Sequence, residues 1–281
     1  MSLHAEPAGD PRQNKLLAAL PDSEWQRLRR HLEPIEMPVG RTVRESGSQL
    51  PHAYFPTTAI ISLLYATSDG ASTEIAAIGN EGLVGVTLLL GGETTPRLAL
   101  VQSKGWAYRI KGDILKEEFM GGGPIQHLLL RYLQALFTLI GQTAVCNRRH
   151  TIDQQLCRWL LLNLDRLASS NLVMTHELLA NLMGVRREGI TESARKLQVA
   201  GLITYSRGLI TVIDRAGVET CCCECYDVVR QEYERLLGRG LGCGALSPHK
   251  APVRTAAARD LSAPRDAIQC KSVSQSLCTT C

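Results

Sequence analysis

The sequence predicts an α+β protein in which short antiparallel strands come first, one long helix follows, and a compact helical module with a β-hairpin comes last. Three observations lead to this expectation. Short apolar runs separated by turn residues fill positions 35–110, and a helical repeat of apolar residues follows the glycines at 121–123. Two capped helices then precede a pair of short strands beyond position 172. The 281 residues suffice for two domains.

Composition places the chain among ordinary globular proteins. Hydrophobic residues make up 44% of it and charged residues 21%. No uninterrupted apolar run reaches the about 18–20 residues of a membrane-spanning helix. The polar residues 1–12 lack the apolar core of a secretory signal. We therefore expect a cytoplasmic protein with no membrane partner.

The net charge of +4 is unevenly distributed along the chain. Residues 1–120 hold 12 Lys and Arg against 14 Asp and Glu, whereas residues 121–217 hold 11 against 6. Because a basic excess neutralises phosphates, the second segment is the better candidate for contact with nucleic acid.

The first part of the chain is expected to be a short helical segment followed by strands. Leucines recur at near-helical spacing within 14–32, with a break and cap at 21–23. Glycine, aspartate and serine turns then separate the apolar runs Ala59–Tyr65, Glu74–Ile78, Leu98–Val101 and Trp106–Ile110. Several short strands at regular spacing predict an antiparallel sandwich or barrel over 14–120.

A long helix is expected over 121–148. Its apolar residues alternate four and three positions apart, the spacing of a helix that pairs with another helix. These residues are Ile125, Leu129, Tyr132, Leu136, Leu139, Thr143 and Cys146. We expect them to pair two copies of the chain, and packing within one copy is the alternative. The apolar face is wide enough for both, since it also includes Leu128, Leu130, Leu133, Phe137 and Ile140.

The helical module is expected over 149–217, with a further helix at 218–238 and a disordered tail at 239–281. Within it, Thr175 is placed to cap a helix, and Ala180 is small where two helices must cross closely. Gly184 falls in the turn that follows, and Ile190 points back to the first helix. This spacing is typical of a helix-turn-helix, and an ordinary helical hairpin is the alternative.

The second helix of this motif begins near Arg186 with polar residues that cannot be core. Its first turns would face the major groove of DNA. Arg187 can make a bidentate contact to guanine, and Glu188 can accept from cytosine N4. The candidate base contacts are Arg187, Glu188, Thr191 and Glu192. The candidate phosphate contacts are Thr175, Arg186, Arg195, Lys196 and, at the tip of the following hairpin, Arg207. A solvated helix face is the alternative for each charge.

With these motifs, the chain resembles the Crp–Fnr family of bacterial transcription regulators over about residues 14–237. The resemblance is strongest over Met174–Ile203. It implies a jelly-roll-like β-roll sensor, a dimerisation helix, a winged helix-turn-helix, a homodimer on a palindromic double-stranded DNA operator, and contact with RNA polymerase. It also implies base readout by Arg187 and Glu188. Glu192 stands where the best-known member has a second base-reading arginine, which implies a different operator.

The residues that hold cyclic AMP in such sensors are replaced here. By the resemblance, the effector pocket is formed by Gly85, Val86, Arg97 and Leu98. Val86 stands at the position of the ribose-binding glutamate, and Leu98 replaces a phosphate-binding serine. Because valine cannot accept a bond from a ribose hydroxyl, we expect no cyclic AMP and assign no cofactor. The effector is unknown or absent. Arg97 as a plain surface charge, and the roll as a scaffold of a constitutive DNA-binding protein, are the alternatives.

Most of the 10 cysteines follow position 220. Thiolates bind zinc and iron–sulfur centres, but on one helix only Cys221 and Cys225 would share a face. Cys278 and Cys281 form one pair, but no second pair lies beside them, only a single further cysteine. We therefore expect small buried thiols and no metal ligand, with a metal- or redox-responsive regulator as the alternative.

Enzyme motifs are absent from the sequence. It contains no Gly-Lys-Ser/Thr phosphate loop, no Gly-x-Ser-x-Gly elbow and no His-Glu-x-x-His helix. We expect no catalysis. A winged helix used only for protein contact is the remaining competitor, and the arginines that begin the second helix argue against it.

Overall fold

The computed structural model describes residues 8–68, 70–92 and 94–238. The expected tail at 239–281 lies outside these residues. Short helical segments begin the described chain, namely η1 (Pro11–Gln13), α1 (Lys15–Ala18), α2 (Asp22–Leu28) and η2 (Arg29–His31). The side chain of Asn14 caps α1 and also donates to the carbonyl oxygens of Pro56 and Gly82. This buried amide ties the first helix to the strands that follow.

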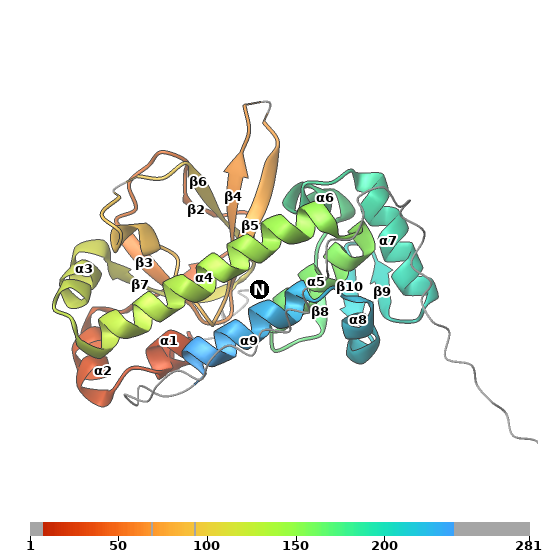
Figure 1. Cartoon of the computed structure of the whole chain (residues 1–281). Helices are drawn as coiled ribbons and strands as arrows, with labels where there is room; N and C mark the ends of the chain where they lie inside the picture. The colour runs from red at the N-terminus through yellow and green to blue at the C-terminus, as the bar shows by residue number, and fades with distance from the viewer. Residues whose placement is uncertain (1–7, 69, 93, 239–281) are drawn as a thin grey trace, which may run out of the picture. The chain divides into compact units, whose positions relative to one another are not determined.

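The strands form two antiparallel sheets, which confirms the predicted roll (Figure 1). One sheet has the order β1-β7-β3, with β1 (Glu33–Met37), β7 (Gly105–Lys111) and β3 (His52–Pro56). The other has the order β2-β6-β4-β5, with β2 (Thr42–Arg44), β6 (Arg97–Ser103), β4 (Ile60–Ala66) and β5 (Ser72–Ile78). Fully buried Phe55, Ile61 and Val101 belong to the core that these strands share. The short η3 (Val86–Leu88) and the helix α3 (Gly112–Met120) complete the roll.

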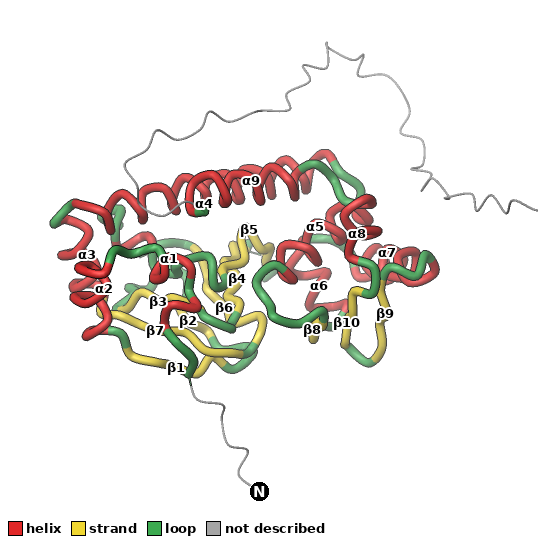
Figure 2. Tube along the Cα trace, turned by 90° about the horizontal axis from the view of Figure 1, so that it is seen from below, coloured by secondary structure: helices red, strands yellow, loops and turns green. Residues whose placement is uncertain are grey.

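The longest helix, α4 (Gly123–Arg149), runs beside α9 (Cys225–Leu237), as Figures 1 and 2 both show. Tyr132 is fully buried on the inner face of α4, and its hydroxyl donates to the Leu83 carbonyl oxygen at 3.1 Å. By length and composition alone, α4 could cross a membrane. Its inner face instead packs on the roll and on α9, as the core helix of a folded domain does.

The expected winged helix-turn-helix is present after α4. Its elements are α5 (Ile152–Leu164), β8 (Asn171–Val173), α6 (His176–Met183), α7 (Arg187–Val199), β9 (Ile203–Ser206) and β10 (Leu209–Val212). Thr151 and Gln154 form a capping box at the start of α5. The three strands form one sheet in the order β8-β10-β9. The three helices and the sheet enclose a second apolar core.

The expected single helix at 218–238 is in fact two helices. Helix α8 (Arg215–Cys221) ends where Cys222 adopts an extended backbone, and α9 begins at Cys225. Asp214 caps α8 by accepting from the Gly217 amide. The break changes which cysteines can meet, because Cys221 and Cys225 no longer lie one turn apart on a continuous helix.

A buried hydrogen-bond ring joins the roll to α5. Ser62 of β4 lies 2.5 Å from a Glu74 carboxyl oxygen and 2.6 Å from the Gln102 amide oxygen. Gln102 donates to Asn163 at 2.7 Å, and Asn163 donates to the Trp159 carbonyl oxygen at 2.8 Å. The Trp159 indole closes the ring by donating to the other oxygen of Glu74 at 3.1 Å.

The ring is satisfied throughout only when Glu74 is protonated. Gln102 uses its amide nitrogen on Asn163, so the single hydroxyl hydrogen of Ser62 must serve the Gln102 oxygen. The bond between Ser62 and Glu74 then requires the hydrogen of a carboxylic acid. Complete burial raises the pKa of Glu74, in agreement with this assignment. The neutral acid costs less to bury than a carboxylate would.

A buried ion pair lies beside the ring. The Arg166 guanidinium donates to Glu81 at 2.8 Å, and their side chains are 5% and 11% exposed. Glu81 belongs to the roll and Arg166 follows α5. The ring and this pair together fix α5 on the roll, and we call them the ring joint.

Candidate nucleic-acid interface

Helix α7 separates an apolar inner face from a charged outer face. Ile190, Ala194 and Leu197 are buried against the other helices of the motif. The exposed residues of its first half and centre are Arg186, Arg187, Glu188, Thr191, Glu192, Arg195 and Lys196. All seven are residues for which the sequence analysis predicts contact with DNA. The structure thus brings them onto one side of one helix.

The turn before α7 has the predicted local chemistry. Thr175 caps α6 by accepting from the Leu178 amide at 3.1 Å. Gly184 adopts a left-handed φ of 66°, which a residue with a side chain rarely adopts. Ala180 and Ile190 are buried where α6 and α7 pack together. The cap, the small residue, the turn glycine and the apolar anchor therefore occupy the positions expected of a helix-turn-helix.

Thr191 is held by its neighbours on the outer face. Its hydroxyl lies 3.0 Å from the Arg187 carbonyl oxygen and 3.1 Å from His176 Nδ1. The His176 ring stacks on Tyr205 of the wing, with ring centroids 4.0 Å apart. Burial, and then the charge of Arg187, lower the pKa of His176, so its ring stays neutral near pH 7. These contacts link α6, α7 and the hairpin.

Glu192 and Lys196 interact with each other and not only with solvent. Lys196 Nζ lies 3.5 Å from Glu192 and 3.1 Å from Asp153 of α5. A phosphate would therefore compete with two carboxylates for Lys196. Arg207 stands at the hairpin tip with a φ of 50°, unusual for a residue other than glycine, and its side chain is exposed. Its position suits contact with a phosphate.

The four residues assigned to the effector pocket do lie together in the roll. Gly85, Val86, Arg97 and Leu98 line one small cavity of about 20 Å³, together with Arg44. Such a volume holds about one water molecule and no nucleotide.

Arg44 was missed in the sequence, and it is the most unusual residue of this cavity. It is 7% exposed and donates to the Thr87 hydroxyl at 3.0 Å, while its Nε and second Nη atoms are buried without a partner. Burial, and then the charge of Arg97, lower the pKa of Arg44. Among the described residues that line the cavity there is no carboxylate. Two arginines thus face one cavity without a counter-charge.

The structure corrects the expected dimer contact. The five residues assigned to it are buried within a single copy of the chain, against the roll and α9, and these are Ile125, Leu129, Tyr132, Leu136 and Leu139. Periodicity identified a buried face but could not tell which surface covers it. The large apolar side chains that α4 leaves exposed are Leu130, Phe137 and Val145. Phe137 is 67% exposed.

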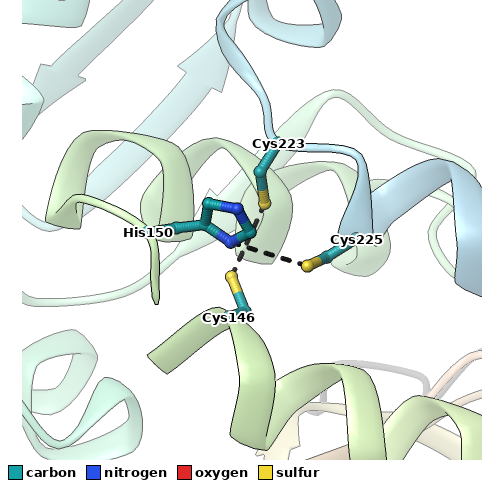
Figure 3. Close-up of side chains that lie close together, drawn as sticks. All are labelled: Cys146, His150, Cys223 and Cys225. Carbon is teal, nitrogen blue, oxygen red and sulfur yellow. Dashed lines mark hydrogen bonds between the residues drawn. The ribbon is translucent and has the colours of Figure 1, made fainter. Parts of the chain in front are cut away.

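Four potential metal ligands meet at the end of α4, although the sequence predicted none (Figure 3). Cys146 lies in the last turn of α4, and His150 follows its end. Cys225 is the first residue of α9, and Cys223 lies two positions before it. Thiols that donate to Cys223, that of Cys146 first, lower the pKa of Cys223. The available signal was the spacing Cys146-x-x-x-His150, which would place both residues on one face if the helix continued through position 150.

The comparisons with known proteins agree with this architecture. Residues 154–221 match the Crp-like helix-turn-helix domain. A transcriptional regulator of the Crp/Fnr family from Eubacterium rectale aligns over 75% of this chain and 98% of its own, with 17% identity and a TM-score of 0.57. FixK2 from Bradyrhizobium japonicum aligns over 68% and 98%, with 13% identity and a TM-score of 0.59.

A third solved structure shows the same likeness. The c-di-GMP-responsive regulator CLP of Xanthomonas campestris aligns over 68% of this chain and 99% of its own, with 18% identity and a TM-score of 0.53. No curated protein matches the chain significantly. The chain therefore carries a Crp-like helix-turn-helix domain, and it has the fold of Crp/Fnr transcription regulators.

Proposed function

We propose that this protein is a dimeric, cytoplasmic transcription regulator that reads an imperfect palindrome in double-stranded DNA. The observation that carries the proposal is the exposed charged face at the start of α7, within a Crp-like helix-turn-helix domain. In such a motif the second helix enters the major groove. Two copies would place two such helices in successive major grooves, about 10–10.5 base pairs apart.

We assign the base contacts to Arg187 and Glu188, which are exposed on the first turn of α7. Arg187 would contact guanine and Glu188 would accept from cytosine N4. Thr191 and Glu192 lie one turn further along, so they would contact the edge of the same half-site. The phosphate contacts are Thr175, Arg186, Arg195, Lys196 and Arg207. RNA polymerase is the protein partner that such a regulator would contact.

The two copies would meet through the exposed face of α4. Leu130, Phe137 and Ala144 recur seven residues apart on that face, and Val145 widens it. A repeat of seven suits a helix that pairs with its own copy. Because Leu130, Phe137 and Val145 are already partly buried, covering the rest of each would favour association by roughly half of the about 1.5–3 kcal/mol that full burial gives.

The signal at the roll would be a compact anion and not a cyclic nucleotide. The cavity has no room for a ribose and base, and none of the described residues that line it offers a counter-charge to its two arginines. An anion that binds there would offset the cost of the buried guanidinium of Arg44. It could shift the regulator only if it binds one arrangement of the domains better than the other.

Arg187→Ala is the variant that tests the DNA-reading assignment. We expect it to weaken binding by about 1–3 kcal/mol per contact and to relax the preference at one position in each half-site. Arg195→Ala should weaken all sequences about equally and reduce the salt dependence. Arg29→Ala, an exposed arginine in the roll region, is the matched control and should change neither. An Arg187→Ala protein with an unchanged sequence preference would remove Arg187 from base readout.

Phe137→Glu tests the dimer. A charge on this face should convert a dimer into a monomer in analytical ultracentrifugation. Met120→Glu is the control, since Met120 is comparably exposed but lies at the end of α3. A wild-type monomer at micromolar concentration, or a Phe137→Glu dimer of unchanged affinity, would contradict the proposed interface.

A further inference from the structure

Cys146, His150, Cys223 and Cys225 place four potential ligand atoms close enough together to surround one metal ion. The sulfur atoms of Cys146 and Cys223 are 3.6 Å apart, and Cys225 Sγ is 3.6 Å from His150 Nδ1. No two of the four ligand atoms are more than 4.8 Å apart. Zinc with ligands at about 2.3 Å for sulfur and about 2.0–2.1 Å for nitrogen separates those ligands by about 3.6–3.8 Å.

The donor set is one that zinc prefers. Three cysteines and one histidine make a closed structural zinc site, which has no position left for water or substrate. Soft thiolates select zinc over magnesium, calcium or manganese. The three cysteines are buried and form a small cluster of their own, against which Cys222 packs. A core that consists of thiols gains little from apolar packing alone, because Cys behaves only as a small hydrophobe.

The histidine is already oriented as a ligand. His150 Nδ1 faces Cys225 (Figure 3). Its Nε2 lies 3.4 Å from the Glu224 carboxylate. A carboxylate this near Nε2 favours the tautomer with its hydrogen on Nε2, which leaves the Nδ1 lone pair free for a metal. This arrangement of carboxylate, histidine and metal is the usual way in which proteins fix a metal-bound imidazole.

We propose that Cys146, His150, Cys223 and Cys225 form a zinc site that clamps both ends of the winged-helix domain to α4. The first two ligands come just before α5, and the other two come just after α8. Cys146 and Cys223 are 77 positions apart in the sequence. One bound ion would therefore close a loop that contains the whole reading module and α8. The site would hold the module at a set position relative to the helix that we propose pairs the two copies.

Metal content of the full chain is the direct test. The protein is stripped with a chelator under reducing conditions, loaded with zinc chloride, passed through a desalting column and analysed for zinc. We expect one zinc per chain for the wild type and for Cys221→Ser, the neighbouring-thiol control. The double variant Cys146→Ser/Cys223→Ser, and Cys225→Ser, should retain none. A full-length variant in which Cys243, Cys270, Cys278 and Cys281 are all serine should still retain one.

Cobalt provides a readout that does not depend on whether a variant folds. Loading the wild type with cobalt chloride should give the absorption of a tetrahedral ion and a charge-transfer band of three thiolates. Zinc should raise the thermal midpoint of the wild type and of Cys221→Ser but leave that of Cys225→Ser unchanged. The full tail-serine variant should give the same cobalt spectrum as the wild type.

Several results would overturn the site. A wild type that is folded by circular dichroism but takes up no zinc would do so. Zinc that survives Cys146→Ser/Cys223→Ser, or that is lost only with the tail cysteines, would place the metal elsewhere. A disulfide between Cys146 and Cys223 in metal-loaded protein, found by mass spectrometry, would also contradict it, because an oxidised pair cannot supply two thiolates.

Discussion

The winged-helix domain is attached to the rest of the chain at two places, and these are built from different chemistry. At the ring joint, each polar group of the hydrogen-bond ring finds a partner within the protein, and Arg166 meets its carboxylate. At the thiol cluster, formed by Cys146, His150, Cys223 and Cys225, three thiols and an imidazole lie within 4.8 Å of one another. Thiols are weak hydrogen-bond donors and acceptors, so this second attachment gains little by itself.

The ring joint is complete without a ligand, whereas a ligand can strengthen the thiol cluster. A satisfied buried polar network is rigid and specifies one arrangement of its parts. The thiol cluster offers strong ligand atoms to a metal but only weak bonds to itself. The ring joint should therefore set the basal stability of the domain contact, and the thiol cluster should respond to the chemical environment.

The largest effect is expected from breaking the buried ion pair of the ring joint. Glu81→Ala leaves Arg166 charged, buried and without its carboxylate, and should cost about 3–5 kcal/mol in the free energy of unfolding by urea. Glu33→Ala is the matched control, because Glu33 and its partner Arg109 are 58% and 36% exposed. That variant should lose less than about 1 kcal/mol. Equal losses in the two variants would contradict the distinction between the buried pair and the exposed pair.

A smaller loss in the free energy of unfolding is expected from a substitution where the helix-turn-helix contacts the roll. Gly184→Ala forces an alanine into a left-handed backbone and places its Cβ 2.8 Å from the Thr73 hydroxyl oxygen of β5. Backbone strain alone should cost about 1–2 kcal/mol. Gly201→Ala is the control, since Gly201 has a φ of 73° but nothing within 4 Å of the added carbon. A Gly184→Ala loss no greater than that of Gly201→Ala would show that the contact with Thr73 contributes nothing.

The protonated acid of the ring joint predicts a pH dependence. The folded protein holds the pKa of Glu74 above its ordinary value, so its contribution is present at low pH and is lost as pH rises through the folded pKa. Between the ordinary pKa of a glutamate and the folded pKa of Glu74, the free energy of unfolding of the wild type should fall by about 1.4 kcal/mol per pH unit. Glu74→Gln keeps a donor for Ser62 and an acceptor for Trp159 but cannot ionise.

Urea unfolding at a series of pH values above the ordinary pKa of a glutamate measures this effect, because a carboxyl group of the unfolded chain is ionised there while Glu74 of the folded protein keeps its proton to higher pH. The advantage of Glu74→Gln over the wild type should grow with pH. The exposed Glu33→Gln serves as control and should run parallel to the wild type. Parallel curves for Glu74→Gln and the wild type would mean that Glu74 is ionised in the folded protein.

The smallest effect is expected at the thiol cluster without metal. In chelator-treated protein, Cys225→Ala should change the free energy of unfolding by about 1 kcal/mol or less, because only a small apolar group is lost. In zinc-loaded protein the same change should be clearly larger. A loss in the metal-free protein as large as that of Glu81→Ala would show that the cluster is a self-sufficient attachment, contrary to the comparison.

Local signals made the helix-turn-helix predictable. Thr175 as a cap and Gly184 as a left-handed turn each depend on a few neighbouring residues, and both occur as expected. The strands of the roll were recognised in the same way from apolar runs and turns. The covering surface of α4 was not predictable, because a helical repeat shows which residues are buried but not against what. Ile125 and Tyr132 accordingly pack within their own copy.

The thiol cluster could not be predicted from spacing, because its halves come from distant parts of the sequence. Cys146 and Cys223 meet only because α9 returns along α4. The expected continuous helix also hid the extended residue at Cys222 that turns Cys223 toward Cys146. Arg44 was missed for a similar reason, since an arginine in a short strand is usually solvated, and only the fold shows it buried.

Selection of bound sequences from a random DNA pool by the full-length protein would show whether two copies read a palindrome through α7. We expect an enriched palindromic motif whose half-sites are centred about 10–10.5 base pairs apart. We also expect Arg187→Ala to select a motif with one position relaxed in each half-site. A pool that shows no enrichment, or a motif that is neither repeated nor altered by Arg187→Ala, would contradict the proposed readout.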